Sequence, residues 1–158
     1  MAKVDHISVF ATAPANSSAP DSITLAGNDV WVAYTNGADS TGLSGSSTIV
    51  EYDRSGHVED TYQIAGYVDG LKFNPVTHEI WALQNQDGNS TLTVINPAEH
   101  SVTLPSSYAN PSSTRGYDDV VFTHGKVFES YTNPVGNGDP TLVQVTTGND
   151  PDGATLHT

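Results

Sequence analysis

Short apolar runs of β-branched and aromatic residues alternate along the chain with turns rich in Gly, Asn, Asp and Pro. Runs of this length and composition predict strands rather than helices. Three pairs of predicted strands share one pattern, in which an aspartate opens the first strand, a tight turn follows, and an asparagine closes the second strand. These pairs cover residues 21–36, 69–85 and 118–133. The sequence therefore predicts an all-β fold with an internal repeat of about 50 residues.

Each repeat continues in the same way beyond the asparagine. A loop leads to a third strand, and a short turn then leads to an outer strand, expected at 57–64 in the first repeat and at 100–104 in the second. The third strands are expected at Thr48–Tyr52, Thr91–Ile95 and Thr141–Val145. Four short strands with turns about every 8–12 residues predict the blade of a β-propeller. We therefore expect a single unit over 1–158 with three four-stranded blades, at 20–66, 67–106 and 116–158.

Three blades are too few to close a ring, because propellers contain roughly four to eight blades. The first and third sheets would each keep an uncovered apolar face. Two copies related by a two-fold axis would provide six blades, so the sequence predicts a half-propeller that is closed by homodimerisation. Residues 4–12 and 154–158 both read as outer strands, and the sequence leaves open which of them completes the third blade.

Aromatic side chains recur at one position of the repeat, as Trp31, Trp81 and Phe128. Packing between neighbouring blades explains this recurrence better than a stacking platform for a ligand does. Histidines recur as well, at matched turns and before matched outer strands. Their recurrence predicts solvated rim residues rather than metal ligands, at His57, His78, His100 and His124.

One stretch of the chain, residues 80–104, resembles a YVTN-type propeller repeat. Val32–Asn36 and Ser130–Asn133 are similar to the aromatic–Val–Thr–Asn element of that family. The segment Asp69–Phe73, Asp-Gly-Leu-Lys-Phe, resembles blade openings in NHL and gluconolactonase/regucalcin-like propellers. These resemblances cover roughly residues 20–147, and their motifs specify a blade rather than an activity.

The gluconolactonase-like resemblance implies a divalent metal, usually calcium, that acidic and amide side chains hold around the central channel. Asp21, Asp69 and Asp118 match blade-opening positions of that group. The Glu-Gly-Pro start of the group is absent here, and aspartates stand where the group has Asn-Gly openings.

Charge narrows the choice of partners. The chain has 5 Lys and Arg against 18 Asp and Glu, a net charge of −13 at pH 7, which argues against nucleic acid as a partner. An acidic surface suits a divalent cation, a polar or cationic ligand, or simple solvation. The absence of cysteine excludes a disulfide framework, and no apolar run is long enough to predict a membrane span. The composition resembles that of periplasmic or secreted bacterial proteins, although the first residues lack the apolar core of a signal peptide.

Aspartates at the start of the innermost strands are the main candidates for chemistry. Asp21, Asp69 and Asp118 should surround the mouth of a channel, where converging carboxylates repel one another and raise their pKa values unless a cation neutralises them. Calcium, with 6–8 oxygen ligands, suits such a ring. Alternatively, each aspartate caps its own loop by accepting hydrogen bonds from nearby backbone N–H groups.

Loops at the same end supply the candidate ligand-binding residues. Arg115 could clamp an anionic group of a substrate or pair with Asp118 or Asp119. The full set is Asn36, Asn85, Arg115, Asp119 and Asn133. Neither a Ser-His-Asp set nor a phosphate-binding loop is recognisable. Two function classes follow: a non-catalytic propeller module or assembly scaffold that binds a small molecule, a protein partner or a cation, and a metal-dependent lactonase or hydrolase.

Overall fold

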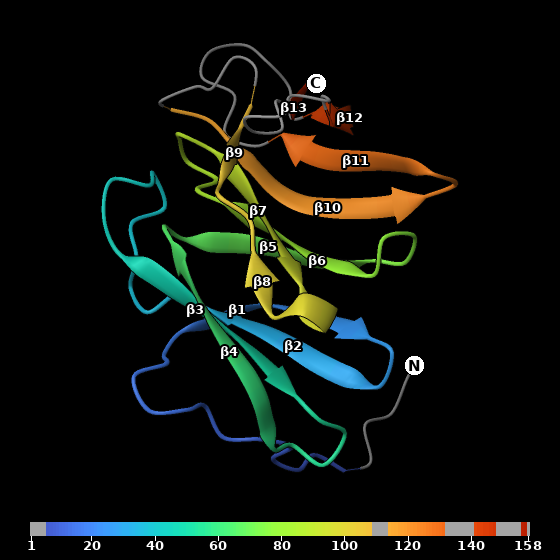
Figure 1. Ribbon diagram of the computed structural model, residues 1–158. Coiled ribbons are helices and arrows are strands. Elements are labelled where there is room, and N and C mark those ends of the chain that lie inside the picture. The colour runs from blue at the N-terminus through green and yellow to red at the C-terminus, as the bar shows by residue number, and fades with distance from the viewer. Residues whose placement is uncertain (1–5, 109–113, 132–140, 148–155, 158) are drawn as a thin grey trace.

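A computed structural model of the chain describes residues 6–108, 114–131, 141–147 and 156–157. Its strands form three antiparallel sheets in chain order, which confirms the all-β prediction. Figure 1 shows the sheets stacked one above another, with the second between the first and the third. No helix in the described part of the chain is long and apolar enough to cross a membrane.

The first and third sheets are simple meanders in which every strand pairs with the next one in sequence, and the second departs from this only in its last strand, which returns to pair with its third. The first contains β1 (Pro20–Ala26), β2 (Asp29–Tyr34), β3 (Ser46–Tyr52) and β4 (Val58–Ala65). The second contains β5 (Val68–Asn74), β6 (Glu79–Gln84), β7 (Thr91–Asn96), β8 (Ser101–Val102) and β9 (Ser106–Ser107), with the 3-10 turn η1 (Pro97–Glu99) between β7 and β8. The third contains β10 (Tyr117–Thr123), β11 (Lys126–Tyr131), β12 (Thr141–Thr147) and β13 (Leu156–His157).

The outer edge of the second sheet differs from the single strand predicted there. β8 and β9 pair with opposite ends of β7, and residues 103–105 lie between them. Pro105 has no N–H to give to a ladder. The Thr103 N–H donates to the Val94 carbonyl at 2.9 Å, but the Thr103 side chain takes the place of a ladder carbonyl, because its Oγ1 accepts a hydrogen bond from the Val94 N–H at 3.0 Å. The outer strand is therefore split in two.

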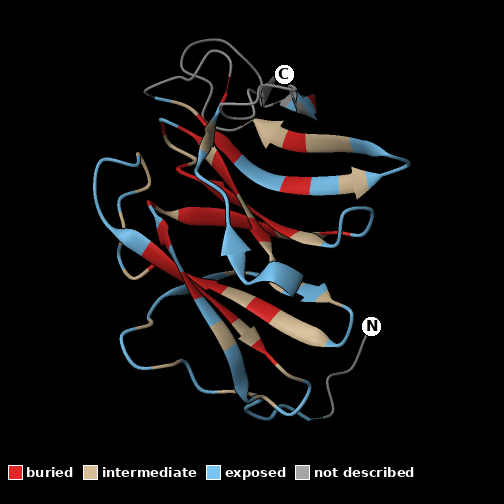
Figure 2. Cartoon of the chain, viewed as in Figure 1, coloured by how far each residue is buried: buried red, intermediate tan, exposed pale blue. Residues whose placement is uncertain are grey.

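The core lies between facing sheets, and Figure 2 marks the buried residues along their strands in red. Alternation along a strand sends Trp31 and Ala33 of β2 towards the second sheet, where they pack in one buried cluster with Leu71, Ile80 and Ala82. A second cluster joins the second sheet to the third. Its buried members are Trp81, Leu83, Leu92, Tyr108, Tyr117, Val120 and Val145.

The innermost strands approach one another closely. Ser22 Oγ accepts a hydrogen bond from the Leu71 N–H at 2.9 Å, and Thr24 Oγ1 accepts one from the Phe73 N–H at 3.2 Å, which links β1 to β5. A Cβ on Gly70 would lie 2.7 Å from the Asp118 carbonyl oxygen, so only glycine allows β5 and β10 to come this near.

Two sheet faces point away from the second sheet. On the first sheet this open face carries Val30 and Val32, together with Ile23 and Leu25, which are 65% and 64% exposed. On the third sheet the open face carries Val121, Phe128 and Leu142, as the register of β10, β11 and β12 requires. The strands thus form an open stack with an apolar surface at either end.

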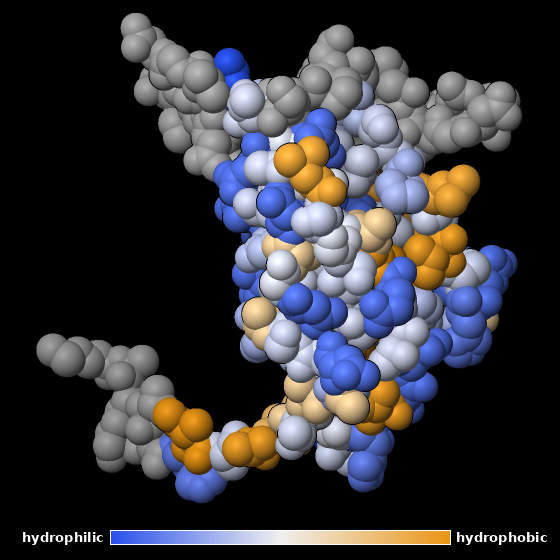
Figure 3. All heavy atoms as spheres, turned by 90° about the vertical axis from the view of Figure 1, so that its left-hand side faces the viewer, coloured by the Kyte–Doolittle hydropathy of each residue, from blue (hydrophilic) through white to orange (hydrophobic). Residues whose placement is uncertain are grey.

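Residues 6–19 form no strand in the single chain, whereas the sequence predicts an outer strand at 4–12. A turn at residues 14–17 bends the segment, with the Ser17 N–H bonded to the Pro14 carbonyl at 3.1 Å. Ile7 and Val9 are 86% and 85% exposed, and Figure 3 shows apolar side chains on the narrow extension at the lower left. The C-terminal strand β13 pairs with the end of β12, so pairing of residues 4–12 with a second copy stays a prediction.

Candidate functional site

A β-bulge lies at the start of each innermost strand. The register shifts between Pro20 and Ser22 in β1, between Val68 and Gly70 in β5, and between Tyr117 and Val120 in β10. The residues left out of the ladders are therefore Asp21, Asp69, and Asp118 with Asp119. A bulge redirects its side chain away from the regular alternation of the strand. All three predicted aspartates thus leave the pleat at the same end of their sheets.

Asp69 is the most deeply placed of these carboxylates. It is buried, and its Oδ2 accepts a hydrogen bond at 2.9 Å from the backbone N–H of Gln86. Burial raises its pKa to about 8, and the charges of Asp21, Asp118 and Asp87 raise it as well, while the Gln86 hydrogen bond opposes them. The bond crosses to the β6–β7 loop, so Asp69 does not cap its own loop. A pKa of about 8 favours the protonated form of this carboxyl group at neutral pH.

The other aspartates act on one another in the same way. Burial and the charges of Asp119, Asp21 and Asp87 raise the pKa of Asp118. Tyr67 donates a hydrogen bond from its hydroxyl to Asp21 Oδ1 at 3.3 Å. The structure thus brings the three predicted aspartates into electrostatic contact at one end of the molecule.

Asp87 is a fourth member that the sequence did not single out. Its Oδ2 accepts a hydrogen bond from Ser40 Oγ at 2.6 Å, and its N–H donates to the Ser40 carbonyl at 3.1 Å. These bonds join the β6–β7 loop to the β2–β3 loop. The sequence offered only the Asp-Gly pair at 87–88, in the loop that begins at Asn85. The contact between Asp87 and Ser40, 47 residues apart, has no local sequence pattern. Asp21, Asp69, Asp87 and Asp118 are called the acidic cluster below.

A second group of carboxylates, the carboxylate trio, lies at the opposite end of the first sheet. Asp29, Glu51 and Glu59 each offer an oxygen, and these oxygens all lie within 4.8 Å of one another. Burial raises the pKa of Glu51 to about 7, and the charges of Asp29, Glu59 and Asp60 add to this, whereas His100 lowers it. Among the described residues, this is the one trio of His, Asp or Glu that meets the spacing. The acidic cluster does not, so it is wider than a preformed ion cage.

The repeated asparagines have a structural role. Asn36 Oδ1 accepts a hydrogen bond from the Ser18 N–H at 2.9 Å, and Asn85 Oδ1 accepts one from the Tyr67 N–H at 3.0 Å. The two sequence separations are both 18 residues, and both asparagines have positive φ, 55° and 66°. This backbone conformation is one that asparagine tolerates better than most residues. Asn36, just after β2, holds the segment before β1, and Asn85, just after β6, holds the segment before β5. Both asparagines are therefore explained without a ligand.

The remaining predicted ligand residues do not form one group. Arg115 is partly buried in the connector that leads to β10. Asp119 accepts a hydrogen bond from the Val120 N–H at 2.8 Å, which is a local cap. Asn133 lies outside the described residues. The structure therefore gathers the predicted carboxylates but not the predicted amides.

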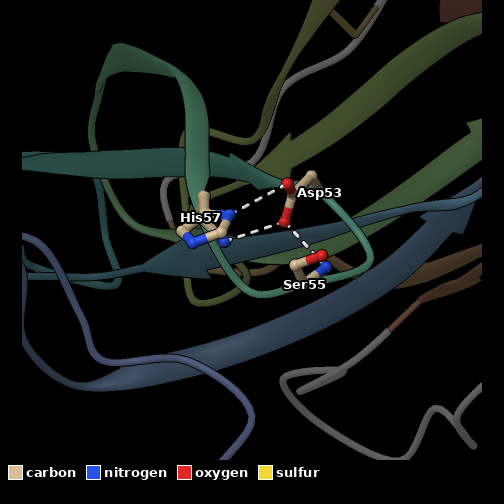
Figure 4. Close-up of polar contacts among 3 residues, drawn as sticks. All are labelled: Asp53, Ser55 and His57. Carbon is tan, nitrogen blue, oxygen red and sulfur yellow. Dashed lines mark hydrogen bonds and ion pairs between the residues drawn. The ribbon is translucent and has the colours of Figure 1, made fainter.

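The recurrent histidines are exposed, as predicted. His78 and His124 occupy tight turns with φ of 60° and 49°. Asp53, Ser55 and His57 lie together in the β3–β4 turn (Figure 4). Asp53 accepts hydrogen bonds from the backbone N–H groups of Ser55 and His57 at 2.7 and 2.8 Å. His57 Nδ1 also lies 3.1 Å from Asp53 Oδ2. Ser55 takes part through its backbone N–H rather than its hydroxyl, so these bonds stabilise the turn and do not make a Ser-His-Asp catalytic set.

Glu129 is a fully buried carboxyl group between the second and third sheets, and the sequence reading missed it. Its Oε2 accepts a hydrogen bond from the Tyr108 hydroxyl at 2.6 Å, while Oε1 has no hydrogen-bond partner among the described residues. Burial raises the pKa of Glu129 to about 7, although the Tyr108 bond acts in the opposite direction. The repeat offered a sequence signal for this burial, because the equivalent positions of the other two sheets carry apolar residues, Val32 and Ala82, where the third sheet has a glutamate.

Comparison with known protein families and with curated proteins finds no match to the chain.

Proposed function

We propose that this chain is half of a six-bladed β-propeller, in which two copies close the ring through their open sheet faces. The ring is a non-catalytic binding module whose acidic cluster receives a cation or a cationic group. One observation carries the proposal: each open face has apolar residues at the repeat positions that are buried between sheets elsewhere in the chain.

The open face of the third sheet repeats the aromatic position. Trp31 of the first sheet is fully buried against the second sheet, and Trp81 of the second sheet packs against Phe122 of the third, with ring centroids 5.0 Å apart. Phe128 stands at the same repeat position and points away from the second sheet. It is partly exposed, and no further sheet packs against it in the described part of the chain. Each tryptophan packs against the next sheet along the chain, whereas Phe128 has no such sheet among the described residues.

The open face of the first sheet has apolar residues at the repeat positions that, in the second sheet, pack against Trp31. In the second sheet these positions are Ile80, Ala82 and Ile95, all fully buried in the cluster that contains Trp31. The equivalent residues of the first sheet are Val30, Val32 and Tyr52. Burial of apolar surface stabilises association by about 25 cal/mol per Å² before the costs of ordering. Phe128 of one copy against the first sheet of the other would therefore repeat a contact that the chain already makes.

Two such contacts related by a two-fold axis join the copies and leave no open face. Three sheets per copy then give six, which lies within the range of ring sizes known for propellers. The resemblance of residues 80–104 to YVTN-type repeats supports the same architecture.

The mass in solution tests the ring. We expect light scattering after size exclusion to give twice the 16.7 kDa chain mass at micromolar concentration, because two apolar faces per chain are otherwise exposed to water. Dilution should reveal a reversible equilibrium. A folded monomer that persists at the highest soluble concentration would contradict the proposal.

Calcium binding tests the acidic cluster separately. Because burial raises the pKa of Asp69 to about 8, a cation that binds there at pH 7 should displace a proton. Titration calorimetry in buffers of different ionisation enthalpy should therefore show calcium binding with release of about one proton. Asp69→Asn should abolish that release, while Asp53→Asn, in the β3–β4 turn, should preserve it.

If calorimetry detects no heat of calcium binding in any buffer, the acidic cluster does not bind calcium, and the proposed ring is unaffected. That result would also remove the alternative of a metal-dependent lactonase, since such an enzyme needs the same ion.

A further inference from the structure

We propose that residues 6–17 form a strap that covers part of the open face of the first sheet in the single chain and must leave that face before a second copy can bind. The inference rests on the proposed ring, because it names what regulates the closure of that ring.

Contacts at two consecutive residues hold the strap in place. Ala11 packs against a buried cluster formed by Tyr34, Val50 and Tyr52, all on the open face of the first sheet. Phe10 lines a groove of about 840 Å³. The other residues lining this groove include Ile23, Leu25 and Val30 of the same face, together with Phe73, Val121 and Phe122.

The β3–β4 turn leaves room for this contact. A Cβ on Gly56 would clash with the carbonyl oxygen of Phe10 and would touch the Cβ of Ala11. Gly56 also has a φ of +82°, which the turn requires. The strap thus fits closely against the end of the first sheet at this point.

The strap occupies the place that a preceding sheet would take. Ile95 in the second sheet is buried by the first sheet, whereas Tyr52, its equivalent in the first sheet, lies in the cluster that Ala11 covers. The cover is incomplete, because Ile23 and Leu25 remain mostly exposed. A second copy that brings Phe128 would bury more of this face than Phe10 and Ala11 do, so exchange of the strap for the second copy is favourable.

The strap has a fixed attachment on one side and few contacts on the other. The Ser18 N–H and carbonyl both bond to Asn36, and the Thr35 N–H bonds to the Ala19 carbonyl at 3.0 Å. Before this anchor, Ile7 and Val9 are exposed, and no strand pairing holds residues 6–17. Movement of the strap would therefore begin at Ser18 and would not disturb β1.

The test measures the dimer dissociation constant of full-length variants by sedimentation equilibrium. Ala11→Asp places a charge against the cluster of Tyr34, Val50 and Tyr52 and should release the strap. We expect the dimer dissociation constant to fall about tenfold or more. If the strap leaves the face free in about one tenth of the chains or fewer, the apparent affinity is weaker than the intrinsic one by that factor, and release of the strap restores it. Ile7→Ser, at an exposed position of the same strap, is the matched control and should leave the constant unchanged.

Deletion of residues 1–11 provides a second variant with the same expected result, and circular dichroism establishes that both variants are folded. If either folded variant dimerises more weakly than the full chain, the strap belongs to the interface, as an exchanged outer strand would, and the inference fails. An unchanged constant in a dimeric protein also overturns the strap while leaving the ring intact. Monomers in every variant at all concentrations would overturn the ring itself.

Discussion

Phe128→Asp is expected to convert the dimer into a folded monomer. The side chain would lie at the centre of the proposed contact between the third sheet of one copy and the first sheet of the other, and an aspartate there would bury an unpaired charge. Loss of an aromatic anchor together with burial of a charge should weaken dimerisation about a hundredfold or more. Because Phe128 lies on the open face, outside the cluster that joins the second and third sheets, the fold of the monomer should survive. Sedimentation and circular dichroism measure the two effects separately.

Val76→Asp is the matched control for this substitution. Val76 is an exposed apolar residue in the turn between β5 and β6, away from both open faces. The same change of side chain there should leave the dissociation constant unaltered. A Phe128→Asp protein that dimerises as well as the unaltered chain would show that the third sheet does not face a second copy.

Glu129→Gln is expected to remove a large part of the pH dependence of stability. The pKa of Glu129 is about 7 in the folded protein against an ordinary value of 4.5, so the folded state binds this proton more tightly than the unfolded state does. Its contribution to stability is therefore complete below about pH 4.5 and is lost as the pH rises through 7. A shift of this size corresponds to a loss on the order of 3 kcal/mol. Glutamine retains the acceptor for Tyr108 and cannot ionise.

Urea unfolding at pH 5 and pH 8, at one fixed protein concentration, measures the effect. The variant should match the unaltered protein at pH 5 and should be the more stable of the two at pH 8. Glu99→Gln, at the exposed 3-10 turn, is the control and should leave the difference between the two pH values unchanged. Equal pH dependence in the Glu129→Gln protein would mean that the carboxyl group is not desolvated between the sheets.

Much of the sheet architecture was predictable because its causes are local. Alternation of apolar side chains and tight turns marks β2 and β6, and recurrence of the pattern aligns Trp31 with Trp81. The split outer edge of the second sheet was not predictable in the same way. It depends on the Thr103 side chain completing a ladder that Pro105 interrupts.

The candidate site was predictable only in part, because contacts between distant segments determine its details. The convergence of Asp21, Asp69 and Asp118 followed from their shared repeat position. The participation of Asp87 depends on Ser40 in another sheet, and no local pattern reports that contact. The sequence predicts ligand residues at Asn36 and Asn85, because an asparagine next to a loop looks the same in sequence whether it binds a ligand or a backbone N–H 18 residues away.

The bulges at the entrance of each inner strand also matter for protein engineering. Since Asp21, Asp69 and Asp118 lie outside the ladder registers of their strands, the hydrogen bonds between strands do not depend on which side chains stand at these positions. Asp21 and Asp118 are exposed, so histidines there would present imidazoles to transition metals and lysines would present cations to anions. The buried Asp69, which accepts a hydrogen bond from the Gln86 N–H, would be kept. The sheets thus provide a surface whose chemistry can be rewritten without redesign of the scaffold beneath it.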